Sequence, residues 1–110
     1  MGNPFGNISG LGDMMKQAKK MYEAAQKVQE ELANERIETA SGGGMVKVTV
    51  TGKGDLLEVK IDPQVVDSDD VEMLEDLVTT AIREALSKAH EIEAERMQTV
   101  TGGLGLPGMF

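Results

Sequence analysis

GGGMVKVTVTGKGDLLEVKIDP, residues 42–63, is the stretch that decides the predicted fold. Valines alternate with polar residues in its first half, and leucine, valine and isoleucine alternate with charged residues in its second half. Alternation with a period of two, flanked by glycines, predicts a β-hairpin with one buried face. With Lys53-Gly54 as the turn, the predicted register pairs Val46 with Ile61, Val48 with Val59 and Val50 with Leu57.

A two-stranded hairpin is only marginally stable alone, and the long helical patterns on either side are the candidates to cover it. The first pattern begins after Asp13, a suitable N-cap, and ends near Glu35. Its apolar residues recur every three or four positions, which indicates a narrow seam for contact with another helix. The seam consists of Met14, Ala18, Met21, Ala25, Val28 and Leu32.

The second helical pattern runs from Asp70 to Thr99, which corresponds to about 45 Å of helix. Asp69 and Glu72 form a variant of the capping box at its start. The neighbouring acidic residues also resemble a metal site, but the positive end of a helix accounts better for them. Because the helix is longer than a small hairpin can cover, its last third should project or pack on the first helix or another subunit.

The predicted fold is therefore of the α+β class. A long N-terminal helix leads to a small antiparallel sheet of about three strands, with the hairpin at 45–62, and a long C-terminal helix follows. Residues 36–41, RIETAS, contain two β-branched residues and predict the third, edge strand. We predict one domain over 13–100, between a flexible arm at 1–12 and a flexible glycine-rich tail at 101–110.

Charge is distributed unevenly along the chain. The 110 residues carry 19 acidic and 11 basic side chains and a formal charge of −8, so nucleic acid and anionic membranes should on average repel the protein. Residues up to 29 nevertheless have a net charge of +2, whereas residues 64–99 have a net charge of −7. The basic residues of the first helix are Lys16, Lys19, Lys20 and Lys27. Without further information, these lysines read as the solvated face of an amphipathic helix.

The sequence contains no motif typical of an enzyme active site. The chain has no cysteine and one histidine, His90, which lacks the second histidine that a zinc-binding helix needs. Gly52-Lys53-Gly54 has neither the spacing nor the hydroxyl of a P-loop. No apolar run approaches the ~20 residues of a membrane span. We expect a soluble cytoplasmic protein with no catalytic or metal site, no cofactor, no small-molecule substrate and no membrane contact.

Four segments together resemble the YbaB/EbfC family of bacterial nucleoid-associated proteins. They are LGDMMKQA at 11–18, GMVKVTVTG at 44–52, VKIDP at 59–63 and EMLEDLV at 72–78. The resemblance implies a tweezer-like homodimer whose sheets associate and whose helices extend outward to bind DNA at the nucleoid. It implies that Lys16, Lys19, Lys20 and Lys27 contact DNA, with Arg96 beside them from the second helix. The apolar residues of the hairpin would serve the core and the dimer contact.

Two functions are open at this point. The first is a dimeric, non-enzymatic protein that binds double-stranded DNA mainly through phosphates, with low sequence selectivity and an effect on nucleoid organisation or gene expression. The second is a dimeric protein–protein adaptor without significant DNA binding, which the acidic net charge favours.

Overall fold

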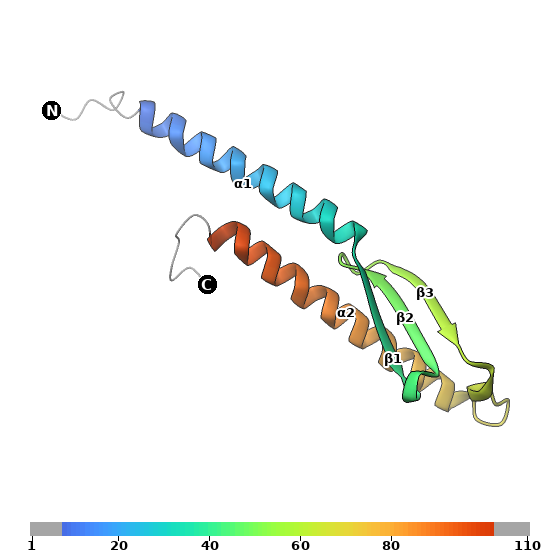
Figure 1. Cartoon of the computed structure of the whole chain (residues 1–110). Helices are drawn as coiled ribbons and strands as arrows, with labels where there is room; N and C mark the ends of the chain where they lie inside the picture. The colour runs from blue at the N-terminus through green and yellow to red at the C-terminus, as the bar shows by residue number, and fades with distance from the viewer. Residues whose placement is uncertain (1–7, 103–110) are drawn as a thin grey trace.

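The computed structural model describes residues 8–102 of the chain and has an elongated shape of 82 × 26 × 16 Å. The fold consists of two long helices and a three-stranded antiparallel sheet, which confirms the predicted α+β class and the third strand. One helix lies along the sheet, and the other extends away from its end (Figure 1). Two short 3₁₀ turns, labelled η, complete the fold. The elements in chain order are α1 (Ile8–Asn34), β1 (Arg36–Ser41), η2 (Gly42–Gly44), β2 (Val46–Thr51), β3 (Leu56–Ile61), η3 (Pro63–Val65) and α2 (Val71–Gly102).

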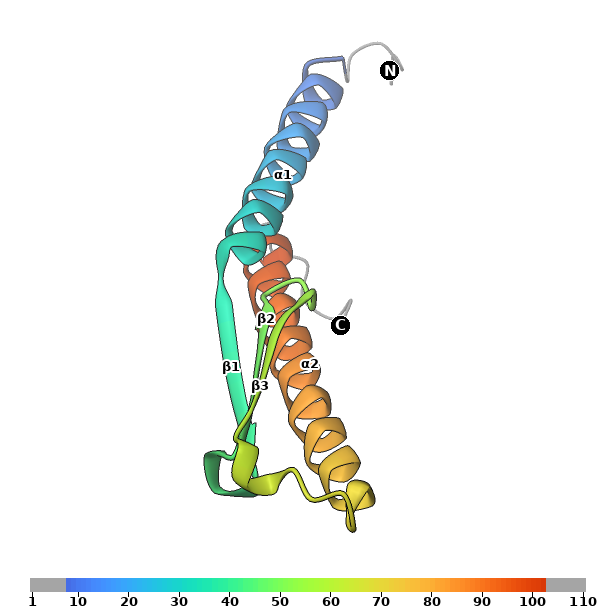
Figure 2. The ribbon, with the colours of Figure 1, turned by 90° about the vertical axis from the view of Figure 1, so that its right-hand side faces the viewer.

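The core lies between α2 and one face of the sheet. The strand order is β1-β2-β3, and α2 packs mainly on β1 and β2 (Figure 2). Alanines at every fourth position of α2 are buried, and their small side chains let the helix backbone approach the strands. Hydroxyl groups of β1 then reach α2 directly, because Thr39 Oγ1 donates to the Ala81 carbonyl and Ser41 Oγ to the Leu77 carbonyl, both at 2.6 Å. The core residues are Ile37, Val46, Val48, Val50, Ala81, Ala85 and Ala89.

The hairpin follows the predicted register except beside its turn. The pairs Val46–Ile61 and Val48–Val59 are confirmed, but Val50 pairs with Leu56 and not with Leu57. The turn runs from Thr51 to Gly54, where the Gly54 N–H donates to the Thr51 carbonyl at 2.9 Å. Its central pair is therefore Gly52-Lys53, so the predicted turn was one residue late, and the φ of 89° at Gly54 suits glycine.

Leu57 is the extra residue of a β-bulge. The turn requires Thr51 N–H to donate to the Asp55 carbonyl, which places Leu56 opposite Val50. The ladder further along requires Val59 opposite Val48. These two requirements differ by one residue, and the bulge at Leu57 absorbs the difference.

The predicted apolar ladder is only half buried. Val46, Val48 and Val50 are fully buried, whereas Ile61 is 39% exposed and Leu57 49% exposed. Val59 is partly buried against the core. Leu57 and Ile61 are exposed because α2 lies over β1 and β2 and β3 extends beyond the edge of the helix. The part of these two residues in a dimer contact stays a prediction.

Both helices begin at residues other than those predicted. Helix α1 starts at Ile8, so residues 8–12 belong to a helix and not to an arm, and Asp13 is not its N-cap. Once a helix is nucleated, each added residue gains a backbone hydrogen bond, which offsets the cost of Gly10 and Gly12. Helix α2 is capped by Asp70, not Asp69: Asp70 Oδ1 accepts from the Met73 N–H at 3.2 Å.

The predicted flexible arm and tail lie mostly outside the described residues. Helix α2 extends to Gly102, so residues 101–102 are helical and were wrongly assigned to the tail. The rest of the predicted arm, 1–7, and of the predicted tail, 103–110, fall outside the part of the chain that the structure describes.

Helix α1 is held at its C-terminal end. Leu32 is fully buried, and its carbonyl accepts from the Gly52 N–H at 2.8 Å and from the Glu35 N–H at 3.1 Å. From this point α1 runs antiparallel to α2, and its N-terminal half extends past the described end of α2 in both views (Figures 1 and 2). The predicted seam is therefore in contact with α2 only in part: Val28 and Ala25 are half-buried, but Met14 and Ala18 are exposed.

Candidate nucleic-acid interface

Four lysines share one side of α1. Lys16, Lys20 and Lys27 lie within about 40° of one another around the helix at 3.6 residues per turn, and Lys19 is adjacent. All four side chains are exposed, and none forms an ion pair within residues 8–102. We call these four residues the lysine face. The seam faces the opposite direction, so packing of α1 on α2 leaves the lysine face in solvent.

Three of the four lysines are on the part of α1 that is farthest from the sheet and from the start of α2 (Figure 1). The N-terminal half of α1 projects past the described end of α2 (Figure 1). Lys16, Lys19 and Lys20 belong to this half, and Lys27 belongs to the other. Four lysines against Asp13 and Glu23 give residues 13–27 a net charge of +2. At physiological ionic strength, charges are screened over about 8 Å, so the acids of the distant sheet and of the start of α2 act only weakly here.

Arg96 does not lie with Lys16, Lys19 and Lys20. Its guanidinium forms a partly buried ion pair with Glu35, directly after the end of α1. Glu35 follows Lys20 by fifteen residues, about 22 Å along a helix. The expectation that Arg96 would stand beside Lys16, Lys19 and Lys20 was therefore wrong. Packing of α2 on α1 brings the Arg96 guanidinium to the C-terminal end of α1, where the Glu35 carboxylate pairs with it.

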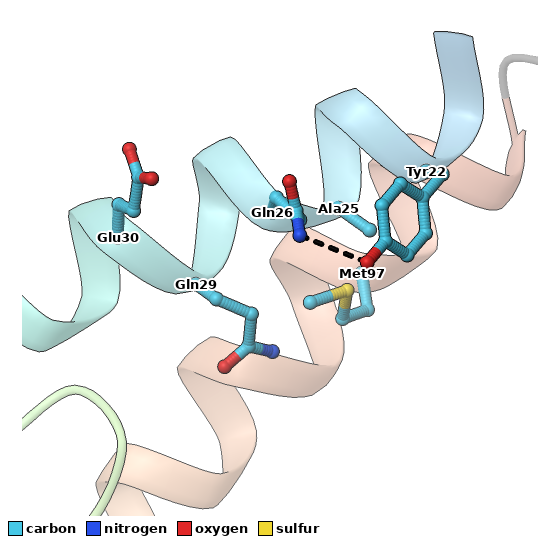
Figure 3. A pocket seen from close by; sticks show the side chains of 6 residues that line it. All are labelled: Tyr22, Ala25, Gln26, Gln29, Glu30 and Met97. Carbon is cyan, nitrogen blue, oxygen red and sulfur yellow. Dashed lines mark hydrogen bonds between the residues drawn. The ribbon is translucent and has the colours of Figure 1, made fainter. Parts of the chain in front are cut away.

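Sequence reasoning missed a groove between the two helices. It is lined on one side by α1 and on the other by Met97 of α2 (Figure 3). Gln26 Nε2 donates to the Tyr22 hydroxyl at 2.9 Å, which holds the ring at the rim of the groove. The sequence did contain one signal for this groove. The apolar seam extends farther toward the N-terminus than a single partner helix can cover, which leaves part of it open. The lining residues are Tyr22, Ala25, Gln26, Gln29, Glu30 and Met97.

Two further searches of residues 8–102 gave negative results. Nowhere in this range do three or more His, Cys, Asp or Glu side chains gather as a group that could hold a metal ion. Neither of the long helices there has a stretch apolar enough to cross a membrane. The acidic residues before α2 instead make local bonds, as in the Asp69 N–H donating to Asp67 Oδ1 at 2.8 Å.

Comparison with known proteins places similar chains in several bacteria. The family model described as "YbaB/EbfC DNA-binding family" matches residues 7–104. A nucleoid-associated protein of Ruminiclostridium cellulolyticum is 49% identical over 111 residues, covering 99% of this chain and 96% of the relative. A nucleoid-associated protein of Dictyoglomus turgidum is 48% identical and covers 100% of both chains. Among solved structures, the uncharacterized protein HP0035 from Helicobacter pylori matches with a TM-score of 0.59 and 25% identity, over 77% of this chain and 92% of that one.

Proposed function

Because this chain belongs to the YbaB/EbfC DNA-binding family, we propose that it is a homodimeric, nucleoid-associated protein that binds double-stranded DNA through phosphate contacts. The observation that carries this proposal is the lysine face of α1, whose four side chains form no ion pair within residues 8–102. Three of the four, Lys16, Lys19 and Lys20, are on the projecting half of the helix (Figure 1). The names of its relatives, "Nucleoid-associated protein", support the nucleoid as the place of action. The effect that we propose for this binding is on nucleoid organisation or gene expression.

The chemistry of the lysine face favours phosphate over base contacts. A lysine ammonium is a compact point charge on a flexible stem, suited to a phosphate oxygen but without the planar fork that arginine presents to a guanine edge. Phosphate contacts position a protein on the duplex without reading sequence. Low sequence selectivity follows from this composition. The formal charge of −8 per chain further restricts the approach of DNA to the projecting part of α1.

The proposed dimer contact is the exposed edge of β3. Leu57, Ile61 and, on the adjoining side of α2, Leu86 are 39–49% exposed. Among the described residues, the outer edge of β3 pairs with no other strand. An apolar strand edge is a template for association with a second sheet. Two chains joined there would present two lysine faces to one duplex and double the number of phosphate contacts.

The dimer contact is tested by placing a charge in it. The double variant Leu57→Glu/Ile61→Glu is expected to convert the dimer to a monomer, since burying unpaired carboxylates costs far more than the apolar contact gains. Sedimentation velocity across a concentration series measures the change. Lys47→Glu is the matched control, because Lys47 is exposed on the opposite face of the sheet, and it should leave the dimer intact. A double variant that sediments like the unchanged protein would rule out β3 as the contact.

DNA binding itself is tested by fluorescence anisotropy with a labelled ~30 bp duplex across a salt series. Each phosphate contact contributes roughly −0.9 to the slope of log K against log salt. Four lysines in each of two chains predict a slope of about −3 to −7. Duplexes of the same length but shuffled sequence should bind within a few-fold of one another. An affinity that does not change between low and high salt would contradict the proposal.

A protein–protein adaptor is the second candidate, favoured by the acidic charge and by the exposed apolar side chains of α1. It predicts no measurable DNA binding at ~50 mM salt with the dimer intact. It also predicts a stoichiometric protein partner that is retained after nuclease treatment. Recovery of DNA-dependent partners alone would count against it.

A further inference from the structure

Within residues 8–102, the apolar side of α1 has a partner over only half its length. Near the sheet it packs on α2, but toward the N-terminus four large apolar side chains are 56–67% exposed: Leu11, Met14, Met15 and Tyr22. Together with Ala18 and Met21 they form a continuous strip, which we call the α1 strip. Large apolar side chains gathered on one side of a helix indicate a contact surface.

The α1 strip begins where the contact between α1 and α2 ends, and it continues toward the N-terminus of α1. The last turns of α2 lie against the middle of α1: Met97 faces Tyr22 and Ala25 across one groove (Figure 3), and Val100 lines a second groove with Ala24. Helix α2 ends at Gly102. The C-terminal end of α2 is therefore beside the Tyr22 end of the α1 strip. The axis of α2 points along the strip toward its Leu11 end (Figures 1 and 2).

We propose that residues 103–110, GLGLPGMF, dock on the α1 strip of the same chain. The segment contains Leu104, Leu106, Met109 and Phe110 and no charged side chain, so its composition matches an apolar strip. Eight residues span up to about 26 Å when extended, whereas the strip from Tyr22 to Leu11 is about 16 Å long. The segment has ample length to cover it.

Other occupants match the strip less well. Residues 1–7 leave α1 at its outer end and would have to reverse direction to reach Tyr22, and only Met1 and Phe5 among them are large and apolar. Lys16, Lys20 and Lys27 are on the opposite side of α1, so docking of residues 103–110 leaves them accessible, whereas Lys19 borders the strip between Met15 and Tyr22. The proposal is therefore independent of the proposed DNA binding, and its test contains no DNA.

Tyr22 supplies a direct test, because it is the one tyrosine and the chain has no tryptophan. Its intrinsic fluorescence, quenched by acrylamide, reports how exposed the ring is. We expect the triple variant Leu104→Ser/Leu106→Ser/Phe110→Ser to raise the quenching constant roughly twofold over the unchanged chain, since loss of the apolar contact returns the ring to water. Val66→Ser, the same kind of change at an exposed residue far from α1, should have no effect.

Three results would overturn the proposal. Equal quenching in the triple variant and the unchanged chain would mean that residues 103–110 do not cover the strip. A rise in quenching on removal of residues 1–7, and none in the triple variant, would assign the strip to the N-terminal segment. A quenching constant of Tyr22 that falls as the protein concentration rises would mean that a second copy of the chain covers the α1 strip.

A spin label then identifies the chain that supplies the segment. The sequence has no cysteine, so Gly108→Cys carries the label at one position. We expect broadening of the amide resonances of residues 11–22 in the labelled chain itself. Mixing an isotope-labelled chain without the spin label with a spin-labelled chain of natural isotopic abundance should give none. Broadening in that mixture would overturn docking within one chain.

Discussion

Replacing Lys16, Lys19 and Lys20 together with glutamate is expected to lower the affinity for duplex DNA at ~50 mM salt by at least about 100-fold. Each change removes a proposed phosphate contact and adds a like charge that the DNA repels. In a dimer the salt slope should become shallower by about 5, from six lost contacts at roughly 0.9 each. The measurement is the anisotropy titration described above. Because all three side chains are exposed, the fold should be unaffected.

The matched control is Lys47→Glu/Lys53→Glu/Lys88→Glu. It changes the net charge by the same amount, and its three exposed lysines belong to the sheet, its turn and α2. We expect a loss of affinity of less than about tenfold, since charges beyond a Debye length are largely screened. An equal loss in both triple variants would show that net charge, and not the lysine face, controls binding.

The substitution Gly52→Ala is expected to lower the free energy of unfolding by about 3 kcal/mol, mainly through overpacking at 1–3 kcal/mol and loss of one backbone hydrogen bond at about 1 kcal/mol. A Cβ atom at this buried position would lie 2.8 Å from the Leu32 carbonyl oxygen and 3.1 Å from its Cα. Both are backbone atoms, so no side chain can rotate away. The same displacement breaks the bond from the Gly52 N–H to the Leu32 carbonyl, which holds α1 on the hairpin.

Urea denaturation measures this effect as a lower midpoint at an unchanged slope. Gly12→Ala is the control, because nothing lies within 4 Å of a Cβ there and the residue is inside α1. It should stabilise the protein by about 0.5–1 kcal/mol, as expected for alanine in a helix. An unchanged midpoint for Gly52→Ala would mean that α1 is not held at the hairpin turn.

The candidate site was predictable from the sequence in one respect and not in another. Helical periodicity put the four lysines of α1 on one side of the helix, and the structure has all of them exposed there. The position of Arg96 was not predictable. Its partner, Glu35, is 61 residues away in the chain, and no local pattern relates two helices at that separation.

The sequence by itself determined the type and order of the elements, the buried face of β2 and the third strand. These depend on periodicity, glycine turns and β-branching, which act between residues a few positions apart. Only the tertiary structure decided the bulge at Leu57, the exposure of β3 and the length of α1 that α2 covers. Each of these depends on where one element lies relative to another that is distant in the chain. That placement follows from packing, such as the contact of Leu32 with Gly52, and not from local propensity.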